Sequence, residues 1–156
     1  MYLAMIILLM GVFPALSVIF EFWALHGSAD LSFLIGQWFV FWGVGVRLML
    51  AGLRQIANPT FTADVIFGVK EKAALTLVQE LGFANLSIGL LGVLALVRSE
   101  WVVPAAITGG LFYGLAGMKH LIKGDRNRTE NIAMVSDLWI FLVLAGFLGT
   151  LMLRPA

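Results

Sequence analysis

Six polar residues lie inside long apolar stretches, where side chains of their kind are costly without partners. They are Arg47, Glu80, Asn85, Lys119, His120 and Asp137. An ionisable side chain at the centre of a membrane helix costs about 2.5–3.5 kcal/mol on insertion scales, so such residues face the helix bundle and are paired there. Arginine suits an anionic partner, because its planar guanidinium donates two parallel hydrogen bonds to a carboxylate or phosphate. The six residues therefore predict one polar cluster, which either binds a ligand or holds the bundle together.

The depth of each residue in its helix suggests how the cluster is paired. At 1.5 Å per residue, Arg47 and Glu80 lie about 13 Å and 10 Å from the inner ends of their helices. We expect Arg47 to pair with Glu80 for this reason. Lys119 or His120, in the last turn of the next helix, is expected to pair with Asp137.

Other kinds of chemistry have no support in the sequence. There is no cysteine, which excludes disulfides, thiolate metal sites and cysteine nucleophiles. No G-x-S-x-G, H-E-x-x-H or P-loop pattern occurs. The two histidines, His26 and His120, are expected on opposite faces of the membrane and so cannot share a metal ion. We therefore expect no metal and no cofactor. We also expect no nucleic-acid partner, because the basic residues are few and flank apolar segments.

The elements that position these residues are expected to be membrane helices. The 156 residues are 61% hydrophobic and 12% charged, against roughly 45–50% and 25% in soluble domains. A bilayer core of about 30 Å needs roughly 20 apolar residues in a helix. Five stretches meet that length: Tyr2–Leu25, Phe33–Ile56, Ala73–Val97, Trp101–Ile122 and Ile132–Leu153. The predicted fold is all-α, a polytopic bundle of five transmembrane helices forming a single domain over residues 1–156.

One segment between the spans is neither fully apolar nor fully polar. Asn58 and Pro59 end the second span, since the residue before a proline avoids the α region. The following residues, Thr60–Lys72, place apolar side chains near helical spacing among charged ones. A short helix in the headgroup region fits this pattern. An extension of the third span by one or two turns fits it too, and both interpretations stay open.

The loop charges predict an orientation. One side carries Arg54, Lys70, Lys72, Lys119, Lys123, Arg126 and Arg128, and the other carries Arg98 and Arg154. Positive residues stay in the cytoplasm, so the N-terminus is expected inside and the C-terminus outside. Glu21, near the outer end of the first span, is expected either to be solvated or to face Arg98.

Small residues recur at helical spacing in three spans. They are Gly82, Gly89 and Gly92 with Asn85, then Gly110, Gly114 and Gly117, then Gly146 and Gly149. Small residues let membrane helices approach closely. These stripes indicate either helix contacts within the chain or a face for self-association.

One stretch carries a family resemblance. The segment Gln79–Gly92, with Arg47 in the second span and Asn58 and Pro59 after it, resembles a family of uncharacterised small bacterial integral membrane proteins. More distantly, an arginine in a glycine-rich second helix is similar to DoxX-like four-helix membrane proteins, from which this chain departs by its fifth span. The resemblance implies a protein of the bacterial inner membrane and supplies no reaction.

Three functions follow as hypotheses. The first is a non-enzymatic accessory or assembly subunit that associates with other membrane proteins or with itself, in contact with membrane lipids. The alternative is a binder or transporter of a small anionic ligand or lipid, using Arg47, Glu80 and Asn85. The third is an intramembrane enzyme acting on a lipid, with Glu80 and His120 as the only acid–base candidates.

Overall fold

The computed structural model describes residues 2–153 of the chain and confirms the five predicted spans. The segments long and apolar enough to cross a membrane are Tyr2–Ala24, Leu31–Ala57, Lys72–Leu94, Ser99–Ile122 and Arg128–Met152. Within residues 2–153 all regular structure is helical. The fifth span begins four residues earlier than predicted, because Asn127 caps it by accepting a hydrogen bond from the backbone N–H of Glu130, 2.8 Å away.

The first span is interrupted by a π-helical turn. It consists of α1 (Tyr2–Ile7), the π-helix η1 (Leu8–Val12) and α2 (Phe13–Ala24). Pro14 follows the interruption and has no backbone N–H to donate to the carbonyl of Met10, one turn earlier. The indole Nε1 of Trp139 donates to that carbonyl instead, at 2.8 Å. The π-helical turn and Pro14 together change the direction of the first span where it contacts the fifth.

The second span is interrupted in the same way. It consists of α3 (Leu31–Phe39), the π-helix η2 (Val40–Val46) and α4 (Arg47–Ala57). The cap of α3 is Asp30, whose carboxylate accepts hydrogen bonds from the backbone N–H groups of Ser32 and Phe33. A π-helical segment shifts the direction in which later side chains point. Arg47 is the first residue after η2, so its direction depends on this shift.

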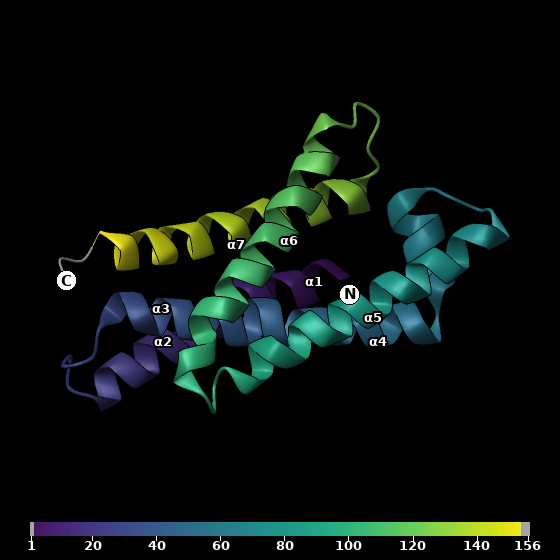
Figure 1. Ribbon diagram of the computed structural model, residues 1–156. Helices are drawn as coiled ribbons and strands as arrows, with labels where there is room; N and C mark the ends of the chain where they lie inside the picture. The colour runs from purple at the N-terminus through teal and green to yellow at the C-terminus, as the bar shows by residue number, and fades with distance from the viewer. Residues whose placement is uncertain (1, 154–156) are drawn as a thin grey trace.

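The third span, α5 (Lys72–Leu94), packs along η2 and α4 with its backbone in contact (Figure 1). A Cβ added at Gly92 would lie 2.6 Å from the backbone N of Gly45, and one added at Gly52 would lie 2.6 Å from the carbonyl O of Gly82. Such distances leave no room for a side chain. The stripe of small residues in α5 is therefore a contact within the chain.

The last two spans form a second close pair. They are α6 (Val102–Ile122), which follows the short 3₁₀ turn η4 (Ser99–Trp101), and α7 (Arg128–Met152). Gly114 and Gly117 of α6 receive the side chains of Phe141 and Leu138 of α7. By contrast, Gly146 and Gly149 have no neighbouring atom within 4 Å of an added Cβ.

The segment between the second and third spans forms a separate short helix. The π-helix η3 covers Phe61–Phe67, and it ends at Gly68, whose φ of +70° is the left-handed conformation that favours glycine. Glu71 is extended, and α5 begins at Lys72. The interpretation of 60–72 as an extension of the third span is therefore wrong.

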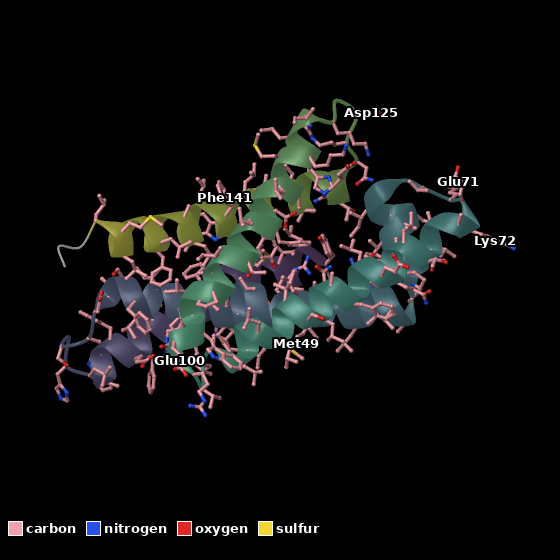
Figure 2. The ribbon with its side chains drawn as sticks, in the orientation of Figure 1. Met49, Glu71, Lys72, Glu100, Asp125 and Phe141 are labelled. Carbon is pink, nitrogen blue, oxygen red and sulfur yellow. The ribbon has the colours of Figure 1, made fainter. Side chains whose placement is uncertain are left out.

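The connections gather at two ends of the bundle. In Figures 1 and 2, η3, Glu71 and Lys72 lie on the right together with the α6–α7 connection that carries Asp125, whereas the α2–α3 turn and the end of α7 lie on the left. The lysine- and arginine-rich connections thus share one end. Arg154, counted for the orientation, lies outside the described residues.

Glu21 of the first span is hydrogen-bonded to the second span. The indole Nε1 of Trp38 donates to its carboxylate at 2.6 Å. Arg98 pairs with Glu100 at 3.9 Å. The alternative in which Glu21 faces Arg98 is therefore wrong.

Candidate functional site

A cavity of about 490 Å³ lies between α1, α4, η3, α5, α6 and α7, at the end of the bundle that carries the basic connections. Most of its wall is apolar, with Leu48, Ile66 and Leu81 among the lining side chains. Its polar lining residues are Tyr2, Arg47, Gln55, Thr62, Asn85, Tyr113, Lys119, His120, Lys123, Glu130 and Asp137. An apolar cavity with a few convergent polar groups has the character of a small-molecule site.

Arg47 is the buried cation of this cavity. Its side chain is 9% exposed, and its terminal Nη2 donates a long hydrogen bond of 3.4 Å to the hydroxyl of Tyr2. The guanidinium carbon also lies 5.9 Å from the centre of the Tyr2 ring. The inner Nε–H is buried and has no hydrogen-bond partner. Arg47 thus has a donor left over for another molecule.

Asn85, another residue of the cavity wall, has an unpaired acceptor. Its amide Nδ2 donates to Oε1 of Gln55 at 2.8 Å, across the close contact between α5 and α4. Its Oδ1 is buried without a partner. A buried polar atom left unpaired costs about 1–3 kcal/mol. Within residues 2–153, the Arg47 Nε and the Asn85 Oδ1 are the buried side-chain nitrogen and oxygen atoms in this state, and both belong to residues of the cavity wall.

Asp137 adds a carboxylate to the wall from α7. It is 8% exposed. The ion pairs of the described residues involve Glu100 and Glu130 but not Asp137. Arg47 and Asp137 are thus a buried cation and a buried carboxylate of the cavity wall that do not form an ion pair with each other.

A charged cluster stands at the mouth. Glu130, in the first turn of α7, is 2% exposed and receives hydrogen bonds of 3.0 Å from the ammonium of Lys123 to both carboxylate oxygens. The Nδ1 of His120 lies 3.0 Å from the same carboxylate. A negative charge at this position is also stabilising, because it lies at the N-terminus of α7. The carboxylate of Glu130 is thus paired within this cluster, unlike the Arg47 Nε and the Asn85 Oδ1.

The helix η3 covers part of the cavity through Thr62 and Ile66. Three contacts hold it there. The guanidinium of Arg54 lies 3.7 Å from the centre of the Phe61 ring, that ring is 6.4 Å from the ring of Tyr2, and the side-chain amide of Asn127 donates to the carbonyl of Val65 at 3.0 Å. Elements α1, α4 and the start of α7 thus fix η3 over the site.

The structure brings five of the six predicted site residues to one cavity: Arg47, Asn85, Lys119, His120 and Asp137. Glu80 is the exception, because its side chain is exposed on α5 and is not part of the cavity wall. The predicted Arg47–Glu80 pair is therefore wrong.

The second predicted pair is also wrong. The partner of His120 is Glu130 rather than Asp137, and the ion pairs of the described residues do not include Lys119. Glu130 was missed because the fifth span was predicted to begin after it. Asn127 followed three residues later by Glu130 resembles a capping box, and that signal would have placed Glu130 in the first turn of the helix.

The histidines lie far from each other in the fold. His26 is in the α2–α3 turn and His120 near the end of α6, at the two ends of the bundle. Within residues 2–153, no group of three or more histidine, aspartate or glutamate side chains is placed to hold a metal ion.

Comparison with known proteins identifies a family of unknown function. No curated protein and no solved structure matches the chain. A family model matches residues 1–152, which is nearly the whole sequence. The chain therefore belongs to the family of unknown function DUF6790.

Proposed function

We propose that this protein binds a small amphipathic molecule in the cavity, with an anionic head at Arg47. The observation that carries the proposal is the pair of buried unpaired atoms on the cavity residues, Nε of Arg47 and Oδ1 of Asn85. The costs of two such atoms add up to a sizeable part of the stability of a small domain. A ligand that pairs with both would recover those costs on binding.

The chemistry of the wall specifies the ligand. Arg47 requires an acceptor, and Asn85 requires a donor. Asp137 on the same wall also accepts a hydrogen bond when ionised. An anionic oxygen on the head group meets the requirement of Arg47, and an N–H or O–H group on the same head would pair with Asn85 or Asp137. The rest of the ligand would contact the apolar wall.

The charge at the mouth supports an anion more than a cation. Lys119 and Lys123 line the cavity, and the carboxylate of Glu130 is shared between Lys123 and His120. Lys119 is exposed there, so its ammonium is available to an approaching ligand. A cavity edge with excess positive charge raises the local concentration of anions.

The membrane setting is part of the proposal. The basic connections at one end support an N-terminus in the cytoplasm and a C-terminus outside, and the resemblance carried by Gln79–Gly92 supports insertion in a bacterial inner membrane. The ligand would then approach from the cytoplasmic half of the bilayer.

The other functions predicted from the sequence have less support. The small-residue stripes favoured an accessory or self-associating subunit, yet the glycines of α5 and several of α6 face helices of the same chain. Association with other membrane proteins or with itself stays a prediction. The lipid-modifying enzyme relied on Glu80 and His120. Glu80 lies away from the cavity and His120 is bound to Glu130, and we do not propose this function.

The experiment compares three probes that share one chain: octanoate, octanol and octylamine. The purified full chain is titrated in detergent, and thermal stability is measured. A ligand at one hundred times its Kd stabilises the folded state by about 2.7 kcal/mol. We expect octanoate to stabilise most, and Arg47→Gln to weaken octanoate binding about tenfold or more, as loss of a charged hydrogen bond does.

Two further variants separate binding from folding. Lys119→Gln changes an exposed side chain at the mouth and is expected to weaken octanoate binding less than Arg47→Gln does. Glu80→Gln is the matched control on α5, outside the cavity, and is expected to bind octanoate as the parent chain does. Equal stabilisation by octanoate and octanol, or unchanged octanoate binding in folded Arg47→Gln, contradicts the proposal.

A further inference from the structure

A groove separate from the cavity runs between the first span and α7. It consists of two adjoining hollows of about 590 Å³ and 480 Å³, which share Ile6 and Ile7. The first continues along Leu3, Ile132 and Val135 to Arg128. The second continues along Met10 and Gly11 to Trp139. The groove thus has a polar end at Arg128 and an apolar end at Trp139, and Ile6 and Ile7 lie between the two ends.

The groove and the cavity occupy different sides of the contact between α1 and α7. Tyr2 and Asp137 line the cavity, whereas Leu3 and Val135 line the groove. Neighbouring residues of a helix point in different directions. A ligand in the groove therefore does not touch Arg47 or Asn85, and the two sites can be tested independently.

Local sequence explains the shape of the groove. Pro14 leaves the carbonyl of Met10 without its usual donor, and Trp139 Nε1 donates to it at 2.8 Å. This bond ties the first span to α7 at the apolar end. Gly11 adds no side chain to the wall, and a Cβ placed there would meet no atom within 4 Å.

Length and charge indicate the occupant. Arg128 and Trp139 are eleven residues apart in α7, which is about 16 Å along a helix. That is roughly half of a 30 Å hydrocarbon core, or one leaflet. Arg128 is exposed, and no ion pair or hydrogen bond involves its side chain within residues 2–153. The groove thus offers a free guanidinium above an apolar channel one leaflet long.

We infer that the groove binds one anionic glycerophospholipid, from the leaflet on the side of the basic connections. Its phosphate contacts Arg128, and one acyl chain follows Ile6, Ile7 and Gly11 toward Trp139. A bulk lipid at an ordinary helix surface has neither the fixed cation nor the hollow. The inference does not depend on the proposed function of the cavity.

The first test measures head-group preference. The full chain is reconstituted with equal amounts of phosphatidylglycerol and phosphatidylcholine that carry identical acyl chains, and retained lipid is counted by native mass spectrometry. We expect one phosphatidylglycerol to be retained in preference. Arg128→Gln should reduce that preference about fivefold, which is the contribution of one basic residue to anionic-lipid binding. Arg98→Gln, another exposed arginine, should leave it unchanged.

The second test blocks the channel. Gly11→Leu adds a side chain where there is open space, so the fold should tolerate it while the channel is filled. Gly146→Leu makes the same change at an open position of α7 outside the groove. With brominated acyl chains, quenching of Trp139 fluorescence is taken as the difference between the parent chain and Trp139→Phe. Gly11→Leu should reduce this quenching and the retained lipid, and Gly146→Leu should reduce neither.

Three results overturn the inference. They are equal retention of the two lipids by the parent chain, an unchanged preference in Arg128→Gln, and full quenching of Trp139 in folded Gly11→Leu. Octanoate binding in the cavity is expected to be normal in both groove variants, so failure of one proposal does not imply failure of the other.

Discussion

The close contact between α4 and α5 predicts opposite effects for one substitution at two glycines. A Cβ at Gly89 would lie 2.5 Å from the backbone N of Met49, and one at Gly146 would meet nothing within 4 Å. In Gly89→Ala the helices must part by about 0.9 Å to reach an ordinary contact of 3.4 Å (3.4 minus 2.5). The same shift would stretch the 2.8 Å hydrogen bond between Asn85 and Gln55, one turn away, beyond hydrogen-bond range.

The magnitude follows from three effects. Overpacking costs about 1–3 kcal/mol, and the lost interhelical hydrogen bond costs about 0.6 kcal/mol in a membrane protein. Alanine recovers up to about 1 kcal/mol of helix propensity. Gly89→Ala is therefore expected to destabilise the chain by roughly 0.6–3.6 kcal/mol. Gly146→Ala has only the propensity gain and is expected to stabilise it by up to about 1 kcal/mol.

The assay is unfolding in mixed micelles with rising dodecyl sulfate, followed by tryptophan fluorescence. The midpoint should fall for Gly89→Ala and rise or stay constant for Gly146→Ala. The reasoning is refuted if both variants shift the midpoint in the same direction by similar amounts.

Two further predictions concern the mouth of the cavity and the orientation. Glu130→Gln removes the carboxylate that Lys123 and His120 share, and we expect a loss of about 1–3 kcal/mol in the same unfolding assay; a change below about 0.3 kcal/mol would show that the cluster contributes little. A periplasmic phosphatase fused to the C-terminus should be active and a fluorescent cytoplasmic reporter dark, and the reverse result would contradict the loop-charge orientation.

The spans were predictable because a membrane helix must be long and apolar along its whole length. The segment after Pro59 was harder to predict. Its end depends on the left-handed turn at Gly68, and a segment this short gives a weak periodic signal. The site was predictable in depth but not in direction, because depth follows from counting residues whereas direction depends on the phase of each helix.

Glu80 shows the difference. It precedes Asn85 by five residues, which at 3.6 residues per turn leaves the two side chains about 140° apart around α5. Asn85 shares its face with Gly82 and Gly89, so the stripe of small residues excluded Glu80 from the contact with α4. The direction of Arg47 could not be predicted in this way, because the π-helix η2 precedes it and breaks the regular helical phase.

Several polar side chains elsewhere in the fold are paired, in contrast to the two unpaired atoms of the cavity residues. The indoles of Trp38, Trp42 and Trp139 each donate to an oxygen of another span, at 2.6, 3.0 and 2.8 Å. The hydroxyl of Tyr113, a residue of the cavity wall, donates to the carbonyl of Gly43 at 2.6 Å. A chain that satisfies isolated polar groups in this way has no packing reason to leave the Arg47 Nε and the Asn85 Oδ1 unpaired on one cavity. Local violations of polar pairing are expected at functional sites, and the cavity is where the described part of this chain has them.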